Sequence, residues 1–349
     1  MNDKNDEEDI GKKFPYSAIV FAGLALTVIG FIILYNRFSI LSSYVILKGN
    51  ESNALAMGQF QSYFIAIAAS LFSLVGIIFL ILTFKKQSDS FRRERFENQF
   101  FEMMKIYREN VSEMDYVAPD SLDEMSPTYG RKVFVKINRE FLTLAKDLHI
   151  RFPDIIERDL TSITYLIIFF GVANEGDEML MLSLRKHLYI NRYPQVENYI
   201  KTLSNQRTIY NRKVKKFGGH QIRLGHYFRH LYQTVLFVHS QEFLTQNEKY
   251  DYIKLLRGQM STHEQAVFFY NSLSPLGSKW ELRFRNALTY ELARDMNNNE
   301  MYRNNKPISK SDFLITEYRL IQNIPEGFTD PINPRIFYNI LEFEEDDQF

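Results

Sequence analysis

The sequence is short of several residue types, and each shortage excludes a class of protein. Its 349 residues include no cysteine, which excludes disulfide scaffolds, cysteine nucleophiles, iron–sulfur clusters and cysteine-based zinc sites. Ten prolines and 15 glycines are too few for a collagen-like or extended disordered chain. Neither sign of charge is in excess, because 42 lysines and arginines balance 42 aspartates and glutamates. The net charge therefore indicates no partner, and only the distribution of charge along the chain is informative.

Two long stretches, residues 14–36 and 52–84, contain no charged residue. A helix needs about 20 apolar residues to cross a hydrocarbon layer roughly 30 Å thick, and both stretches reach that length. The sequence predicts transmembrane helices at 15–36 and 62–84, joined into a hairpin by an extracytoplasmic loop at 37–61. Two alternatives stay open: both stretches are buried core helices, or the first is a cleaved signal peptide.

Basic residues are more numerous after the second stretch than in the predicted loop. Those after the stretch are Lys85, Lys86, Arg92, Arg93 and Arg95, and those in the loop are Arg37 and Lys48. The positive-inside rule then places both termini in the cytoplasm. The predicted cytoplasmic parts are an acidic tail, residues 1–14, and a helical domain, residues 85–349, which we call the body.

The composition of the predicted spans restricts their role. Neither contains an aspartate, glutamate, lysine, arginine or histidine, which argues against a proton-coupled transporter or a voltage sensor. Small residues recur at near-helical spacing: Gly23, Gly30, Ala66, Ala69, Ser70, Ser73 and Gly76. Such residues allow close helix contact within one chain or between chains, so a homo-oligomer is one expectation.

The body is predicted to be all-α. Apolar residues recur every three or four positions over 96–114 and 134–148, as in amphipathic helices. Pro153 is expected at the first position of a third helix. The end of that helix, 165–172, is apolar on all faces and is predicted to be the centre of the core. Shorter helical patterns occupy 176–190, 194–204, 221–241, 247–257 and 282–296.

A basic stretch within the body is a candidate anion-binding site. No carboxylate occurs between Glu197 and Glu242. The candidate anion-binding residues are Lys201, Arg207, Arg212, Lys213, Lys215, Lys216 and Arg229. Such a stretch would hold a nucleotide, nucleic acid phosphates or lipid headgroups. The alternative is a basic surface balanced by acidic segments elsewhere in the chain.

Arg223, His226 and His230 share one face of the predicted helix at 221–241. The opposite face carries an apolar stripe of Leu224, Phe228, Leu231, Val235 and Val238. The two histidines have the spacing of metal ligands, but no third ligand is near in sequence, so no metal is predicted. Arg223 and His230 resemble the Arg-x(4–6)-His motif of the HEPN ribonucleases, in which the arginine would stabilise phosphate charge and the histidine would move a proton. Leu224 departs from that motif, which prefers a polar residue there, and a polar face lining an interface or groove is the other interpretation.

Ser261 and Glu264 form a predicted capping box, in which each side chain bonds the other residue's amide at a helix start. The helix that it opens contains Gln265 to Asn271. No phosphate-binding loop, Ser–His–Asp order, His-Glu-x-x-His motif or EF-hand loop occurs in the sequence. No cofactor is therefore predicted. The sequence favours a non-enzymatic role, and a metal-independent ribonuclease is the one enzyme class with any support.

Several motifs of the body resemble those of the phage abortive infection proteins related to lactococcal AbiC. They are Tyr227-Phe-Arg-His-Leu-Tyr232, Tyr252-Ile-Lys-Leu-Leu-Arg257-Gly-Gln-Met-Ser261, Phe268-Phe-Tyr-Asn271 and Glu317-Tyr318 through Asn323-Ile-Pro325. The resemblance covers roughly residues 90–325, and the predicted N-terminal hairpin fits it. It implies antiviral defence, in which infection triggers growth arrest or death of the cell. It brings no catalytic residues with it.

The sequence thus predicts a bacterial inner-membrane protein of phage defence. Its expected partners are the lipid bilayer, a phage component or nucleic acid, and a second copy of the chain. Three mechanisms remain open. In the first, the body triggers or assembles the membrane hairpins, which leads to membrane damage or leakage. In the second, the body cleaves RNA as a HEPN-like enzyme, and in the third it is an anchored binding module without enzymatic activity.

Overall fold

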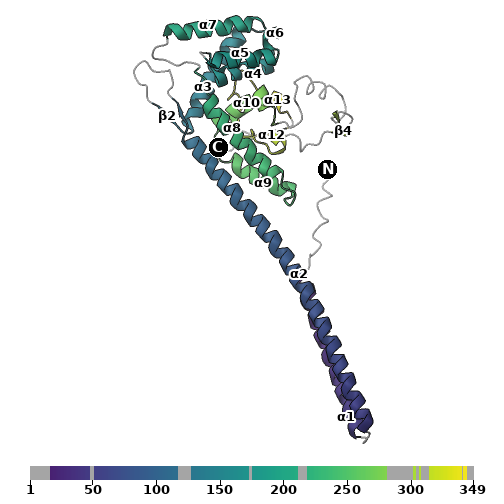
Figure 1. The fold of residues 1–349 in the computed structure, drawn as a ribbon. Coiled ribbons are helices and arrows are strands. Elements are labelled where there is room, and N and C mark those ends of the chain that lie inside the picture. Colours follow the sequence, from purple (N-terminus) through teal and green to yellow (C-terminus); the bar gives the residue numbers. More distant parts are fainter. Residues whose placement is uncertain are drawn as a thin grey trace. The chain divides into compact units, whose positions relative to one another are not determined.

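The computed structural model describes residues 16–47, 51–116, 127–172, 175–210, 218–280, 302–303, 306–307, 314–339 and 341–343. Its elements are α1 (Tyr16–Leu47), α2 (Glu51–Ser112), β1 (Asp115–Tyr116), β2 (Thr128–Tyr129), α3 (Lys132–Arg151), α4 (Glu157–Phe170), α5 (Glu175–Lys186), α6 (Tyr189–Arg192), α7 (Gln195–Tyr210), α8 (Gln221–His239), α9 (Gln246–Arg257), α10 (Thr262–Leu273), the 3-10 helix η1 (Pro275–Gly277), β3 (Tyr302–Arg303), β4 (Lys306–Pro307), α12 (Leu314–Glu317) and α13 (Pro334–Phe337) (Figure 1). The strands in this part of the chain form two short antiparallel pairs, β1–β2 and β3–β4. The all-α class is therefore confirmed.

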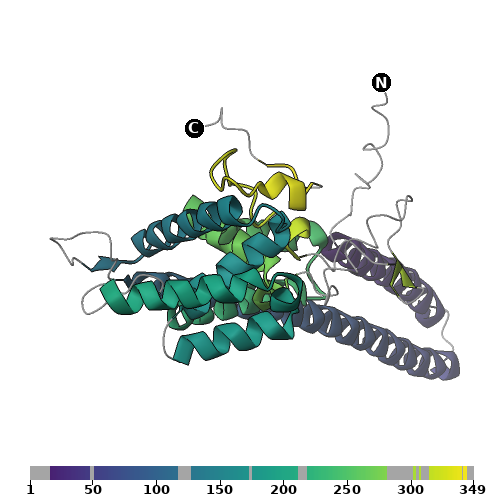
Figure 2. The ribbon, with the colours of Figure 1, turned by 90° about the horizontal axis from the view of Figure 1, so that it is seen from above.

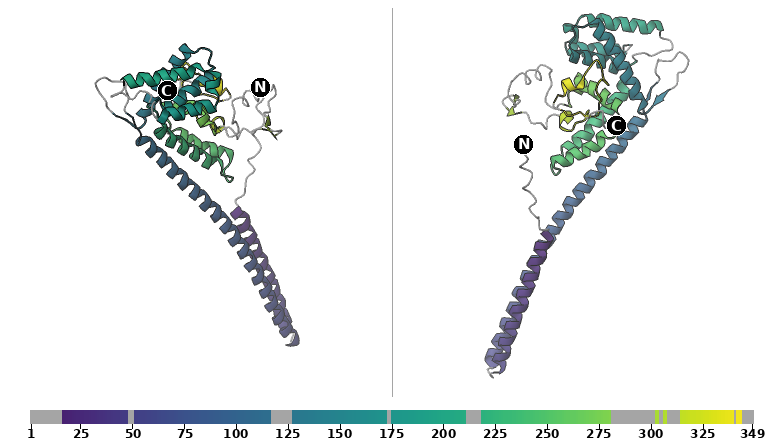
Figure 3. Two further views of the ribbon diagram at one scale, coloured as in Figure 1. Left: turned by 45° about the horizontal axis from the view of Figure 1, so that its top comes forward. Right: turned by 180° about the vertical axis from the view of Figure 1, so that it is seen from behind.

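The chain divides into two compact units within α2. In unit 1 (Met1–Glu97), α1 lies alongside the first part of α2, and the rings of Phe31 and Phe72 make an edge contact with centroids 6.1 Å apart (Figure 3). Among the described residues, one helix is long and apolar enough to cross a membrane, the part of α2 from Ile65 to Ser112. In α1 the apolar helical stretch is shorter, Thr27–Ile40. One of the two predicted spans is thus supported by its length and composition, and the two-span membrane hairpin stays a prediction.

The residues between the two apolar stretches differ from the loop expected at 37–61. The structure continues α1 to Leu47 and begins α2 at Glu51, so most of this segment is helical. The segment contains no proline, and its helix-ending pair Gly49-Asn50 falls between the two helices, so nothing in its sequence ends a helix near residues 37 or 61. The predicted membrane limits at 36, 62 and 84 coincide with no helix end, and they stay predictions.

In unit 2 (Asn98–Phe349), α4 is the centre of the core. Every residue from Asp159 to Phe170 is buried, and α4 packs against α3, α5, α8 and α10. This confirms the expectation from the apolar segment at 165–172. Within this unit, α5, α6 and α7 lie at one end and α9 at the other (Figure 1). The C-terminal segment with α12 and α13 lies on one side of the helices (Figure 2).

Aromatic rings fill the space between α3, α8 and α10. Phe141 and Tyr270 are stacked with their ring planes 5° apart and their centroids 3.5 Å apart. The hydroxyl of Tyr270 donates to Oδ1 of Asn138 at 3.0 Å, so its polar atom is satisfied within the core. Trp280, the single tryptophan of the chain, packs edge-on against Phe268 at 4.6 Å. Its fluorescence should therefore report on the packing of α10 and η1.

The prediction that Pro153 opens a helix is wrong. Pro153 lies in a turn in which the amide of Ile155 donates to the carbonyl of Phe152 at 3.1 Å. A proline is favoured at the second position of such a turn, because its fixed φ suits that position. The helix α4 begins only at Glu157.

The remaining helix predictions hold except at one break. The stretch 176–190 is divided into α5 and α6 by Leu188, which has a left-handed φ of 63°. The helix expected at 282–296 lies outside the described residues. The helices expected at 194–204, 221–241 and 247–257 are confirmed as α7, α8 and α9.

Candidate functional site

Glu264, in the first turn of α10, makes both local and long-range contacts. The predicted capping box is present: Oε2 of Glu264 accepts from the amide of Ser261 at 2.6 Å, and Oγ of Ser261 accepts from the amide of Glu264 at 3.3 Å. The Glu264 side chain is fully buried. A buried carboxylate is stable only when its oxygens are paired. Its second oxygen therefore requires a partner from elsewhere in the fold.

Tyr107, near the end of α2, supplies that partner. Its hydroxyl donates to Oε1 of Glu264 at 2.8 Å and lies 3.4 Å from the hydroxyl of Tyr227 in α8. Burial, followed by the negative charge of Glu264, raises the pKa of Tyr107 well above its ordinary value. The hydroxyl therefore stays protonated and continues to donate. The Glu264 carboxylate thus joins α10 to α2, and the hydroxyl of Tyr107 in turn contacts α8 through Tyr227.

Arg131, at the start of α3, completes this cluster on its solvent side. Its Nε lies 3.8 Å from Oε2 of Glu264, and its Nη2 donates to the carbonyl of Gln259 at 2.7 Å. The Arg131 side chain is 55% exposed, so water screens the ion pair and the pair contributes little to stability. The two contacts instead hold the guanidinium in one orientation, and its other N–H groups remain able to bind a further group.

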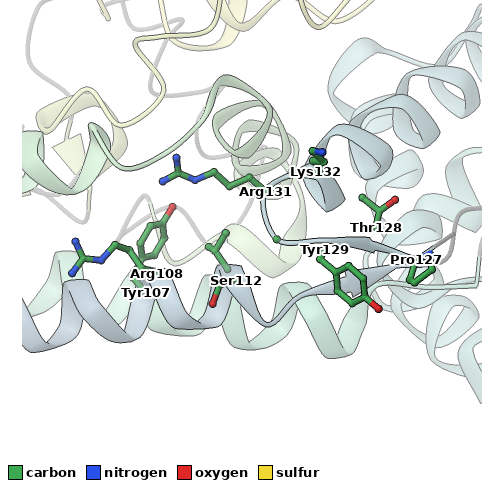
Figure 4. A pocket seen from close by; sticks show the side chains of 10 residues that line it. Tyr107, Arg108, Ser112, Pro127, Thr128, Tyr129, Arg131 and Lys132 are labelled. Atoms are coloured by element: carbon green, nitrogen blue, oxygen red, sulfur yellow. The ribbon is translucent and has the colours of Figure 1, made fainter.

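An open groove of about 770 Å³ adjoins the cluster. Arg108 and Ser112 of α2 line one side, and residues 127–132 line the other (Figure 4). Figure 4 shows Arg108 and Arg131 toward one end of the groove and Tyr129 toward the other. Pockets that bind small molecules usually measure roughly 300–1,000 Å³. The groove is therefore large enough for one.

A second junction joins α9 to the C-terminal segment through Arg257. This side chain is only 5% exposed, and its Nη1 donates to the carbonyls of Tyr318 and Arg319 at 3.3 and 3.0 Å. A buried guanidinium is strongly destabilising unless its donors are satisfied, and the two carbonyls provide acceptors. The motifs at 252–261 and 317–325, which are far apart in sequence, therefore meet here.

The predicted catalytic residues lie on α8, but their side chains do not converge on one site. Arg223 donates through Nε to the carbonyl of Asp115 in β1. The Nε2 of His230 lies 2.8 Å from the carbonyl of Met103 in α2, which can only accept, so Nε2 carries the hydrogen. His226 is exposed. Arg223 and His230 thus attach α8 to other parts of unit 2, and the nuclease assignment stays a prediction.

The candidate anion-binding residues are only partly described. Lys201 forms an ion pair with Glu197, one turn away on α7, at 3.2 Å. Arg229 is exposed on α8. Arg207 lies in α7, but the structure does not describe its side chain. The others, Arg212, Lys213, Lys215 and Lys216, lie outside the described residues. Anion binding by this stretch stays a prediction.

A second buried polar cluster surrounds His220, just before α8. Its Nε2 lies 3.0 Å from Oε2 of Glu140 in α3, and the hydroxyl of Tyr116 donates to the same oxygen at 3.1 Å. The guanidinium of Arg223 lies 5.3 Å from the centroid of the Tyr116 ring. This cluster links β1, α3 and α8.

Sequence reasoning missed the long-range partners at these sites. Tyr107 lies within the apolar pattern at 96–114, so the pattern assigns it to the core without indicating a polar partner. Glu140 lies 80 positions from His220, and Tyr107 lies 157 positions from Glu264. Local spacing carries no signal for contacts at such separations. The capping box was the one signal that pointed to Glu264.

The clusters around Glu264 and His220 both connect separate elements of unit 2 through hydrogen bonds of buried side chains. Oxygens of Glu264 are occupied by Tyr107 and Ser261. Among the residues that the structure describes, no three His, Asp or Glu side chains are grouped closely enough to hold a metal ion. The groove beside Glu264, with its exposed arginines, is therefore the part of this site that is open to a ligand.

Comparison with known proteins relates this part of the fold to one family. Residues 219–301 match the family model described as "Putative phage abortive infection protein". Three of the four motifs that carry the resemblance lie inside this range, at 227–232, 252–261 and 268–271. No curated protein and no solved structure matches the chain. The resemblance is thus confirmed for residues 219–301, which include α8, α9, α10 and the buried residues Arg257 and Glu264: this segment is similar to the phage abortive infection proteins.

Proposed function

We propose that this chain is a membrane-anchored phage defence protein whose body senses infection or acts as the effector. The family match over residues 219–301 is the observation that carries the proposal. It falls on helices that form much of the core of unit 2, including the buried Tyr227, Glu264 and Trp280. In abortive infection the infected cell stops growing or dies, and the phage therefore does not spread.

Exposed apolar side chains support the membrane anchor. In unit 1, Ile67, Leu71 and Ile81 are 60%, 58% and 61% exposed. A long exposed apolar surface is rare on soluble monomers, and contact with lipid tails would bury it. We propose α1 as the second span. With basic residues after position 84, the proposed orientation places both termini on the cytoplasmic side of a bacterial inner membrane.

Deleting residues 1–86 is expected to abolish protection against phage. The deletion removes both proposed spans and leaves the matched residues 219–301 intact. Phage plating on cells that produce the shortened chain should equal plating on cells without the protein. The level of the shortened chain and the emission of Trp280 would establish that it is folded. Full protection by a folded, soluble chain would contradict the membrane part of the proposal.

A matched replacement separates an anchor from an effector. In this variant, residues 15–84 are exchanged for an unrelated two-span anchor in the same orientation. If the hairpin itself damages the membrane, the exchange abolishes protection, and a membrane-potential dye shows no depolarisation during infection. If the body only recruits a phage component or nucleic acid, protection survives the exchange. Crosslinking of the native chain would show whether the proposed spans pair between copies.

The ribonuclease alternative makes a different prediction for His230. Replacing His230 by glutamine keeps an N–H donor for the carbonyl of Met103 but removes acid–base chemistry. We expect His230→Gln to retain protection, because the contact of His230 with Met103 is structural. His149→Gln, the same exchange at an exposed histidine of α3 that is not a predicted site residue, is the matched control. Loss of protection by His230→Gln alone, at an unchanged protein level, would favour the nuclease.

A further inference from the structure

The groove between α2 and residues 127–132 carries a concentration of positive charge outside the basic stretch at 198–241. Arg108, Arg131 and Lys132 line it, and none of its described lining residues is acidic. Within the part of the chain that the structure describes, neither Arg108 nor Lys132 forms an ion pair. Like charges gathered in a concave surface repel one another unless an anion binds between them.

Arg131 is already positioned for such an anion. Its hydrogen bond to the carbonyl of Gln259 uses one of its five N–H donors, and this bond and the ion pair with Glu264 hold the side chain in place. A guanidinium that is oriented before binding loses less side-chain entropy when it contacts a phosphate. The carboxylate of Glu264 offsets some of the positive charge of Arg131. Arg108 and Lys132 therefore provide most of the net positive charge in the groove.

The N-terminus of α3 adds a smaller positive charge to the groove. Arg131 is the N-cap residue of this helix and makes no side-chain cap, and the first turn contains no acidic residue. Helix N-termini carry a partial positive charge that favours anions. Here this field adds to the charge of three basic side chains that line a groove of about 770 Å³.

Tyr129 adds an aromatic surface to the groove. It lies in β2 and is 60% exposed. An exposed ring near a cationic site offers a stacking surface for a planar group such as a nucleic acid base. Figure 4 shows Tyr129 at the end of the groove away from Arg108 and Arg131, and Lys132 between Arg131 and Thr128. The anionic part of one ligand would therefore begin at the two arginines and extend past Lys132, with the planar part at Tyr129.

We propose that this groove binds the phosphate groups of a nucleotide, with Arg108, Arg131 and Lys132 at the phosphates and Tyr129 against the base. The proposal stands independently of the role in phage defence. It is tested by isothermal titration calorimetry of the full chain in detergent, with ATP, inorganic pyrophosphate and adenosine as probes. ATP and pyrophosphate should bind saturably and more weakly as ionic strength rises, and adenosine should not bind measurably.

Charge removal in the groove should weaken binding. The double variant Arg108→Ala with Lys132→Ala is expected to reduce the affinity for ATP and pyrophosphate by at least about tenfold. The matched control, Lys105→Ala with Lys146→Ala, removes equal charge from the same two helices outside the groove and should leave the affinity unchanged. An unchanged Trp280 emission in both would show that folding is intact. Absence of binding by the native chain, or equal losses in both double variants, would overturn the proposal.

Tyr129→Leu distinguishes a nucleotide from inorganic phosphate. It should lower the affinity for ATP by about tenfold through loss of stacking and leave that for pyrophosphate unchanged. Equal affinity for ATP before and after this substitution would overturn the assignment of a nucleotide and leave a site for bare phosphate groups.

Discussion

Replacing Glu264 by alanine is expected to lower the free energy of unfolding by about 3 kcal/mol. The substitution leaves the buried hydroxyl of Tyr107 without its acceptor, and it removes the capping-box bond to the amide of Ser261. An orphaned buried donor costs about 1–3 kcal/mol, and a lost cap about 1 kcal/mol. The pair with Arg131 is partly exposed and adds little.

Thermal unfolding of the full chain in detergent, followed by Trp280 emission, measures this effect. A loss of that size corresponds to a midpoint lower by roughly 6–12 °C for a domain of this size. The chain offers a matched control in α9, where Thr245 and Glu248 form a second capping box near the surface. Glu248→Ala should lower the free energy of unfolding by only about 1 kcal/mol. Equal losses in the two variants would mean that Glu264 acts as a cap alone.

Replacing Gly219 by alanine is expected to destabilise the protein by about 3 kcal/mol. Gly219 has a φ of +84°, which L-residues rarely adopt, and a Cβ built there would lie 2.5 Å from the carbonyl oxygen of Phe170. The chain runs close to the end of α4 at this point, because the amide of His220 donates to the carbonyl of Phe169 at 2.9 Å. The contacted atoms are backbone atoms and cannot move aside without disturbing the core.

Gly225→Ala is a control that is expected to change the free energy of unfolding in the opposite direction. Gly225 lies inside α8, and a Cβ built there meets nothing within 4 Å. Gly225→Ala should therefore raise the free energy of unfolding, by up to about 1 kcal/mol, because alanine is the better helix former. Thermal unfolding of the two variants side by side measures the difference. A stable Gly219→Ala variant would show that the contact between residue 219 and the end of α4 is loose.

Phage plating would connect these stabilities to function. If the body acts as a folded unit, Glu264→Ala and Gly219→Ala should reduce protection in proportion to the loss of folded protein. Gly225→Ala should preserve protection. Loss of protection by a variant with an unchanged amount of folded protein would indicate that the altered residue acts directly in defence.

The sequence was most informative where the structure depends on neighbours in the chain. The apolar stripe of α8, the all-apolar segment in α4 and the capping box at Ser261 were predicted and are present. Each follows from helical periodicity or from a bond that spans three residues. The error at Pro153 has the same origin. Proline suits both a helix start and a turn, and its local sequence does not choose between them.

By itself the sequence determined the helical class, one apolar helix long enough to cross a membrane, and the resemblance to abortive infection proteins over 219–301. Only the tertiary structure decided what the polar residues do. It gave Glu264, predicted as a helix cap, a hydrogen bond from Tyr107 of α2, which also contacts Tyr227 of α8. It engaged Arg223 and His230 in contacts with main-chain carbonyls. It also brought Arg108 of α2 together with Arg131 and Lys132 of a separate segment to line one groove. The physical reason is that the free energy of a buried polar group depends on partners brought close by chain folding, and periodicity along the sequence does not record those partners.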